Sequence, residues 1–340
     1  MKSKILSYLL IIVLAIANLT GCAFSPENNT VQNSCTFFAL DTVIKLTIYD
    51  NDKTSLLKES EELISQYESL FSATLPESDI YRINHAAGEW VTVSDDTISL
   101  LKKALDYCNK SQGTLDITVL PVKNLWDFTG DHPQIPSESA LNTALSHVDY
   151  TKVELNGNKV RLKDPDAMID LGFIAKGYIT DKLWQFLIDS GVKSALLSLG
   201  GNIKAIGTKP DGSSYTVGIQ EPFAETGVPI TTVSISGNYP AYHTEFSSVT
   251  TSGIYERYFE QDGKIYHHII NPSTGYPVDN ELASVTILSD SATDGDALST
   301  LCLSLGLLKG TEYISSLYGV KAIFITKDNE VITVFGMPDA

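Results

Sequence analysis

The chain has 340 residues, of which 43% are hydrophobic and 19% charged, enough for a large core in one domain or two lobes. Its formal net charge is −17. A nucleic-acid partner is therefore not expected, because binding one requires a basic surface. A phosphorylated ligand remains compatible with this charge if its site is locally positive or holds a metal.

The N-terminus has the pattern of a secretory signal. Lys2 and Lys4 precede an apolar run, and Leu19-Thr20-Gly21-Cys22 follows it, as at a lipoprotein cleavage site. We expect a signal peptide over 1–21, a lipidated Cys22 heading a flexible tether over 22–35, and a folded domain over 36–340. The protein is then expected on the extracytoplasmic face of the cell membrane, held by its lipid. An uncleaved anchor is the alternative, although the apolar run is short for a membrane span.

Three further cysteines are spaced too widely for a zinc pattern. They are Cys35, Cys108 and Cys302, and being three they cannot all pair. Cys108 and Cys302 fall on apolar helical faces and are expected to be core thiols.

In the first half of the chain, periodicity predicts a strand, two helices and a hairpin. Alternation predicts a strand over 42–49, and apolar residues at helical spacing predict a helix over about 56–70. A second helix is expected from its N-cap Ser94 to Gly113. Asn156-Gly157 predicts a hairpin over 153–162.

The second half mixes strands and helices. Residues 168–170 resemble a strand end, a helix is expected over 174–189, and a buried strand over 194–199. Further strands are predicted over 215–219, 232–236 and 283–288, helices over 296–305 and 311–318, and a final hairpin from 322–326 and 331–335. Hairpins with irregularly spaced helices favour an α+β fold with mixed or antiparallel sheets and flanking helices.

Asp296 and Thr300 are the first candidate for chemistry. Four residues apart on a helix, they share one face, and carboxylate and hydroxyl oxygens are ligands suited to Mg²⁺. The alternative is that Asp296 and Asp294 merely favour a helix N-terminus, with Thr300 at the surface.

The segment 170–178 is the second candidate. A strand end, a glycine turn at Gly172 and a helix start would direct backbone N–H groups at an anion, and Lys176 adds a cation. The spacing of a Walker A motif is absent, so on this segment alone an ordinary strand–helix turn is the favoured alternative.

His268 is the candidate general base, since imidazole is the commonest base near neutral pH. It lies among apolar neighbours, so a structural histidine is the alternative. Upstream, Arg257 could meet a phosphate or pair with an acid such as Glu256. Serine-hydrolase and dinucleotide-binding glycine motifs are both absent.

Together, these segments form a series. It runs through Leu40-Asp41-Thr42, 113–118 with Pro121 and Leu125-Trp126, 170–172 with 175–181, 199–202, 251–253 with Tyr255 and Arg257, 268–270 with Pro272 and Thr274-Gly275, and 296–300. The series closely resembles the ApbE family of FAD:protein FMN transferases, from about residue 38 to 335. The resemblance implies an ApbE-like, T-fold-like architecture and a lipoprotein form.

The resemblance also implies a reaction. A threonine hydroxyl of a target protein attacks the FMN phosphorus of FAD in the presence of Mg²⁺, AMP leaves, and FMN becomes linked to the target as a phosphoester. Family targets are flavin-carrying subunits of membrane redox complexes and related extracytoplasmic flavoproteins. An FAD pyrophosphatase giving FMN and AMP, or a non-catalytic flavin-binding lipoprotein, are the alternatives.

The roles implied by the resemblance can be placed on this sequence. His268 matches the catalytic base, and the metal ligands match Asp296, Thr300 and the backbone carbonyl of Phe173. Flavin- or phosphate-contacting positions match Leu40, Thr42, Leu115, Asp116, Asp170, Lys176, Ser252, Arg257 and Ile270.

The chain departs from the family pattern at three places. Leu40-Asp41 stands where the family has Met-Gly, and Asn271 replaces an aspartate that would tune His268 by its charge. In the family, an aromatic residue often follows the Leu-Phe-Ser segment, but here Thr74 and Leu75 occupy the nearby positions. Flavin stacking is therefore not expected from that side.

Overall fold

The computed structural model describes residues 33–128, 130, 132–237 and 246–337. The predicted lipid site Cys22 and the signal peptide lie outside these residues. Strand β1 begins at Asn33, so the last three residues expected in the tether belong to the sheet. Among the described helices, none has the length and apolar character needed to cross a membrane.

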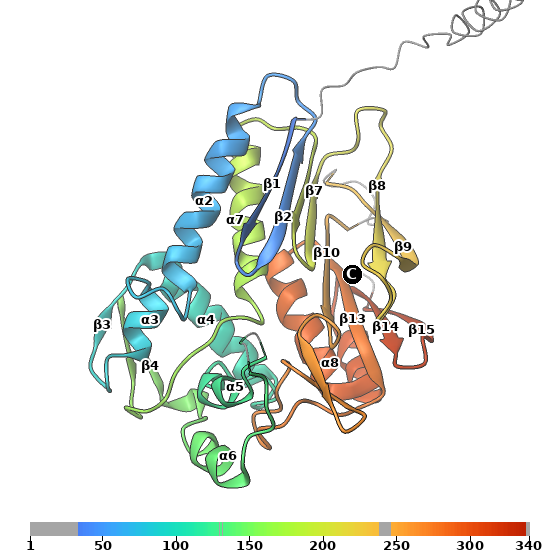
Figure 1. The fold of residues 1–340 in the computed structure, drawn as a ribbon. Helices are drawn as coiled ribbons and strands as arrows, with labels where there is room; N and C mark the ends of the chain where they lie inside the picture. The colour runs from blue at the N-terminus through green and yellow to red at the C-terminus, as the bar shows by residue number, and fades with distance from the viewer. Residues whose placement is uncertain (1–32, 129, 131, 238–245, 338–340) are drawn as a thin grey trace, which may run out of the picture. The chain divides into compact units, whose positions relative to one another are not determined.

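An eight-stranded antiparallel sheet organises the domain (Figure 1). Its order is β1-β2-β6-β7-β10-β13-β14-β15. The strands are β1 (Asn33–Ala39), β2 (Thr42–Ile48), β6 (Ala195–Leu199), β7 (Asn202–Ile206), β10 (Ser248–Gly253), β13 (Leu282–Ser289), β14 (Lys321–Thr326) and β15 (Val331–Phe335).

Each face of this sheet is covered by a different layer. Three helices pack on one face, namely α2 (Ser55–Phe71), α7 (Ala175–Asp189) and α8 (Ala292–Ser315). The hairpin of β8 (Tyr215–Gln220) and β9 (Pro229–Ile235) covers the other with a second apolar cluster. Ile44, Leu46 and Ile48 of β2 are fully buried under the helices, because alternate residues of a strand face the same side.

The remaining elements lie outside the eight-stranded sheet and its main layers. They are α3 (Asp79–Asn84), β3 (Val91–Thr92), α4 (Asp95–Lys110), α5 (Leu120–Trp126), α6 (Glu138–Leu145), a 3₁₀ turn (Tyr150–Lys152), β4 (Val153–Asn156), β5 (Lys159–Leu162), β11 (Tyr258–Gln261) and β12 (Lys264–His267). The Ser94 hydroxyl accepts the N–H of Thr97 as the predicted cap of α4. The antiparallel α+β class is confirmed.

The expected strand end at 168–170 is wrong. Met168 makes one isolated bridge with Val119, and the Asn84 side chain takes the place of a neighbouring strand. Its Nδ2 donates to the Ile169 carbonyl at 2.9 Å and its Oδ1 accepts the Ile169 N–H at 2.7 Å. The two helices predicted over 296–318 are divided at Gly306, whose φ of 77° is not helical. The first begins earlier than expected, at Ala292.

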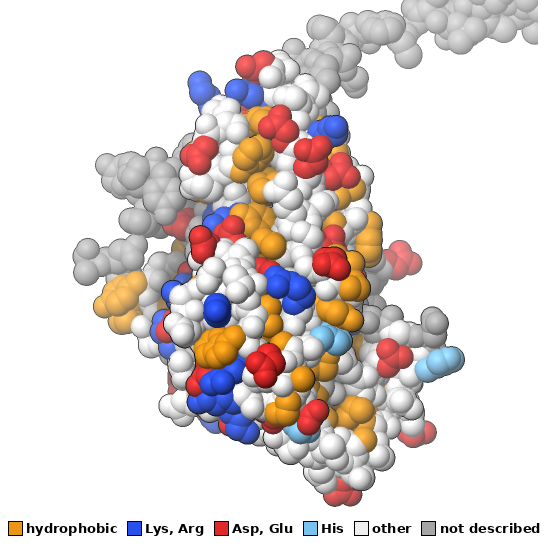
Figure 2. Space-filling model, turned by 90° about the vertical axis from the view of Figure 1, so that its left-hand side faces the viewer, with side chains coloured by type: hydrophobic (Ala, Val, Ile, Leu, Met, Phe, Trp, Pro, Cys, Tyr) orange, Lys and Arg blue, Asp and Glu red, His pale blue; other side chains and the backbone are white. Residues whose placement is uncertain are grey.

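The described thiols and the surface complete the fold. Cys108 and Cys302 are fully buried, as expected, while Cys35 is half-buried, and all three are free. Figure 2 shows acidic side chains spread over one face, with several Lys and Arg side chains gathered in its lower part.

Candidate active site

A cavity of about 630 Å³ contains the described residues that the resemblance implied. It opens among the β1–β2 turn, α5, the start of α7, β10, the segment after β12, and α8. Every one of these predicted positions lines it, namely Leu40, Thr42, Leu115, Asp116, Asp170, Phe173, Lys176, Ser252, Arg257, His268, Ile270, Asp296 and Thr300. Its size suits a large organic ligand.

Asp296 and Thr300 lie on the second and third turns of α8 and share one face, as their spacing predicted. Asp296 is only 4% exposed. Its Oδ2 accepts the Gly177 N–H at 2.8 Å and its Oδ1 accepts Asn202 Nδ2 at 3.3 Å. The Thr300 hydroxyl is 3.0 Å from the Ser252 hydroxyl and 3.3 Å from the Asp296 carbonyl. Asp296 is therefore more than a helix-end residue, because its carboxylate joins α8 to α7 and β7.

The start of α7 is bonded directly to Asp296. In a regular helix the Gly177 N–H would donate to the carbonyl four residues earlier, which is that of Phe173. Here the same N–H donates to Asp296 Oδ2. Phe173, Asp296 and Thr300 all line the cavity, and carbonyl, carboxylate and hydroxyl oxygens are ligands that Mg²⁺ accepts.

Asp170 is paired with Lys123, a residue that the sequence reasoning passed over. Lys123 Nζ contacts Asp170 Oδ2, and both side chains line the cavity. Burial raises the pKa of Asp170, but the charge and hydrogen bond of Lys123 and the N–H of Gly172 outweigh it and lower that pKa overall. The signal for Lys123 was a lysine inside the otherwise apolar helix α5, between Pro121 and Leu125-Trp126 of the family series.

His268 is half-buried and faces several cations. Burial first, and then the neighbouring Lys123, Arg257, His267 and Lys176, lower its pKa to about 3. The imidazole is therefore neutral at pH 7. Its Nδ1 lies 3.3 Å from the Arg257 carbonyl, so the tautomer with a proton on Nδ1 donates there. That tautomer leaves Nε2 able to accept a proton.

The neighbouring His267 has a different environment. It is 3% exposed, and burial lowers its pKa to about 4. Its Nε2 lies 2.9 Å from the Val278 carbonyl, and its Nδ1 accepts the Ile269 N–H at 3.4 Å. Both ring nitrogens are used inside the protein, so His267 is structural and His268 is the titratable group of the pair that lines the cavity.

Two of the sequence departures have clear structural consequences. Leu40 and Asp41 both have φ of 55°, a conformation that suits the glycine of the family pattern and strains other residues. The turn is held by the Leu40 N–H donating to Glu68 Oε1 at 2.8 Å and by Arg257 Nη2 donating to the Asp41 carbonyl at 3.2 Å. Arg257 therefore braces the turn instead of pairing with Glu256.

At position 271, where the family has aspartate, Asn271 Oδ1 accepts the N–H and hydroxyl of Ser273 at 2.9 and 2.7 Å. Both recorded bonds of this side chain serve its own turn. These bonds are local and do not reach His268, and the tuning of His268 by a carboxylate at this position stays an expectation drawn from the family pattern.

Asp116 also has a role inside the protein. One oxygen accepts the Thr118 N–H and hydroxyl at 2.7 and 2.6 Å, and the other accepts the Tyr150 N–H at 3.1 Å. Burial raises its pKa despite these bonds. Asp116 thus holds the loop before α5 in place.

Comparison with known proteins agrees with this arrangement. The ApbE family profile matches residues 40–324. An FAD:protein FMN transferase of Klebsiella pneumoniae is 36% identical over 292 residues, covering 85% of this chain and 87% of that protein. One from Treponema pallidum is 33% identical over 320 residues, covering 88% and 86%.

Solved structures agree as well. The ApbE protein of Thermotoga maritima superimposes with a TM-score of 0.80 at 30% identity, covering 88% of this chain and 96% of that one. The flavin transferase ApbE of Vibrio cholerae gives 0.76 at 25% identity, covering 89% and 96%. On these matches, the chain belongs to the ApbE family.

Proposed function

We propose that this protein is a transferase that moves the FMN moiety of FAD, in a Mg²⁺-dependent reaction, to a threonine hydroxyl of an acceptor protein. The observation that carries the proposal is that two groups of residues, which we call the two walls, line one cavity. One wall carries the neutral imidazole of His268 and the other the oxygen ligands of Phe173, Asp296 and Thr300.

The oxygen wall suits a magnesium ion. Phe173, Asp296 and Thr300 would supply three ligands, and Mg²⁺ commonly completes its shell with water and substrate phosphate. Bound there, Mg²⁺ would neutralise pyrophosphate charge and stabilise the departing phosphate.

The residues of the other wall perform the proton transfer. His268 Nε2 accepts the threonine hydroxyl proton as the threonine oxygen forms its bond to the FMN phosphorus. The bond from that phosphorus to the bridging oxygen breaks, and AMP leaves with that oxygen. Lys123, Lys176 and Arg257 provide the positive charge that a pyrophosphate requires.

The acceptor is expected among flavin-carrying subunits of membrane redox complexes or related extracytoplasmic flavoproteins. A lipid on Cys22 would hold the enzyme at the extracytoplasmic face of the cell membrane. This part of the proposal rests on the residue pattern of 1–22.

The test is to incubate the protein with FAD, Mg²⁺ and a threonine-bearing acceptor, and to measure the acceptor by mass spectrometry. A mass gain equal to FMN, lost when the threonine is replaced by valine, is expected. An unmodified acceptor together with release of AMP and FMN would instead identify the protein as an FAD pyrophosphatase.

A further inference from the structure

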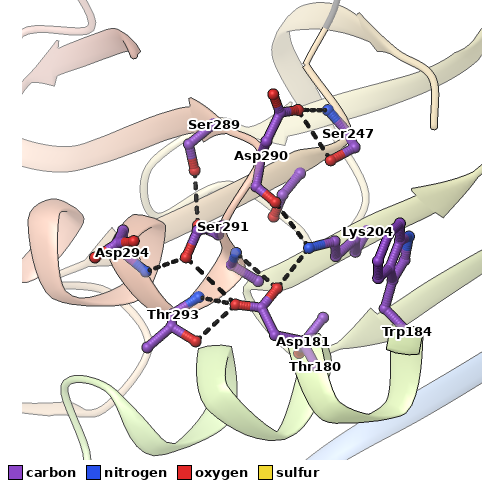
Figure 3. A network of polar contacts seen from close by, with 12 residues as sticks. Thr180, Asp181, Trp184, Lys204, Ser247, Ser289, Asp290, Ser291, Thr293 and Asp294 are labelled. Carbon is purple, nitrogen blue, oxygen red and sulfur yellow. Dashed lines mark hydrogen bonds and ion pairs between the residues drawn. The ribbon is translucent and has the colours of Figure 1, made fainter. Parts of the chain in front are cut away.

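Asp181, on the second turn of α7, binds the N-terminus of α8 (Figure 3). Its Oδ1 accepts the Ala292 N–H at 3.0 Å, and its Oδ2 accepts the Thr293 N–H at 2.9 Å and the Thr293 hydroxyl at 2.6 Å. The Ser291 hydroxyl lies 3.4 Å from Oδ2. A side chain of another helix thus satisfies amides that α8 itself cannot pair.

Lys204 of β7 completes the arrangement. Its Nζ lies 2.5 Å from Asp181 Oδ1, donates to the Asp290 carbonyl at 2.8 Å, and stands 4.7 Å above the centre of the Trp184 ring. Lys204 is 3% exposed, so its charge depends on these partners. We call Asp181 and Lys204, with the α8 amides that they hold, the clamp.

The clamp lies close to the proposed metal ligands along both helices. Gly177, one turn before Asp181, donates its N–H to Asp296 Oδ2 at 2.8 Å. Asp296 follows Ala292 by one turn of α8. A Cβ added at Gly177 would lie 2.2 Å from the Ala292 carbonyl oxygen and 2.8 Å from the Asp296 Cβ. The helices are therefore in close contact at this point, and their spacing there determines where Asp296 stands.

We propose that Asp181 is a positioning residue for the metal site, acting through the α7–α8 contact on Asp296. The inference rests on the proposed Mg²⁺ site. By holding α8 against α7, Asp181 fixes the position of Asp296 relative to the start of α7, where Phe173 would supply its carbonyl to the ion. Residues that orient metal ligands typically change metal affinity by about 10–100-fold when they are replaced.

A simple helix cap elsewhere in the chain provides the matched control. Asp79 is 4% exposed, and its Oδ2 accepts the Ser94 N–H at 2.9 Å and the Thr97 hydroxyl at 2.6 Å at the start of α4. It also pairs with Arg82. Asp79 thus resembles Asp181 in capping the start of another helix and in pairing with a cation, although it is more deeply buried. Among the described residues it makes no hydrogen bond with α7 or α8, so it should not act on Asp296.

The experiment measures Mn²⁺ binding by electron paramagnetic resonance, since Mn²⁺ accepts the same oxygen ligands as Mg²⁺. Thermal unfolding of each protein is recorded in parallel. Asp181→Asn is expected to weaken Mn²⁺ binding by about 10–100-fold, whereas Asp79→Asn lowers the melting temperature and leaves Mn²⁺ affinity unchanged. Equal affinity for Asp181→Asn and the unmodified protein would overturn the inference. Failure of the unmodified protein to bind Mn²⁺ would overturn the proposed metal site itself.

A double variant distinguishes loss of the positioning by Asp181 from destabilisation by an unpaired, buried Lys204. Asp181→Asn leaves the buried Lys204 without its carboxylate, which alone destabilises the protein. Asp181→Asn with Lys204→Met removes that charge, so the melting temperature is expected to recover in part while Mn²⁺ affinity stays low. Recovery of full Mn²⁺ affinity in the double variant would trace the defect to Lys204 and overturn the positioning role. If Asp181→Asn does not fold, the double variant and Thr293→Val are measured in its place. Thr293→Val is expected to weaken Mn²⁺ binding too, but by less.

Discussion

The two walls of the cavity are held in different ways. On the wall of α7 and α8, Asp296 is buried and both of its oxygens are bonded to other elements, with the clamp a turn away. On the other wall, His268 is half-buried, and among the described residues its ring has one hydrogen-bonding partner, the Arg257 carbonyl at 3.3 Å. The first wall is thus built by directional bonds, and the second is tuned by burial and, after it, by nearby charge. Substrate charge should therefore alter the base far more than it alters the metal ligands.

The largest expected effect is loss of the carboxylate on the bonded wall. Asp296→Ala should abolish Mn²⁺ binding and reduce FMN transfer by about 10³-fold or more, since a metal contributes several kcal/mol of transition-state stabilisation. Thr300→Ser, which keeps the hydroxyl, should retain most binding, and Thr300→Val should lose it. Metal titrations followed by transfer rates check this order, and an Asp296→Ala protein with normal metal dependence would contradict the assignment of this wall.

The next effect tests the charge-tuned wall. His268→Ala should reduce transfer by about 10²–10⁴-fold, the usual contribution of a general base. FAD binding, measured by flavin fluorescence, should persist because the cations and the metal ligands remain. His267→Gln should lower the melting temperature more than the transfer rate, because both of its ring nitrogens bond inside the protein. A larger loss of transfer in His267→Gln than in His268→Ala would instead assign the base to His267.

The sequence could predict features that lie within one segment but not contacts between distant segments. Strands β2 and β13 were predicted because alternation or a long apolar run identifies them within one segment. Strand β10 was not, since small polar residues such as Ser248 and Thr250 face its buried side. The family series included residues of both walls and some of their partners, Asp181 among them, but it did not show which of these residues meet. Lys123 meets Asp170 from 47 positions away, and Asp181 meets Ala292 from 111 positions away, and no local period encodes such contacts.

A medium effect concerns the protonation of His268 itself. With a pKa of about 3 it is neutral but weakly basic in the free protein. A bound diphosphate places negative charge among Lys123, Lys176 and Arg257, and opposite charge raises the pKa of an imidazole. The pKa of His268, followed by NMR of labelled histidine, should therefore rise when ADP and Mg²⁺ are added.

Lys123 allows a direct test of this effect, with Lys163 as a control. Lys123→Met should raise the pKa of His268 in the free protein, because Lys123 is the charge that lowers this pKa most. Lys163→Met, which removes a surface lysine paired with Glu154 at 2.6 Å, should leave that pKa unchanged. An unchanged titration in Lys123→Met would show that burial alone sets the base.

The smallest effect is expected at position 271. Asn271→Asp restores the family residue, yet its oxygen can keep both bonds to Ser273. A charge in this partly exposed turn should act on His268 by less than ~1 kcal/mol, so transfer rates should change less than about fivefold between pH 6 and 8. A tenfold gain, accompanied by a higher pKa of His268, would mean that the carboxylate reaches the base through space. In that case the charge-tuned wall would extend into the Asn271–Ser273 turn, and this chain's base would be weaker than that of relatives with aspartate there.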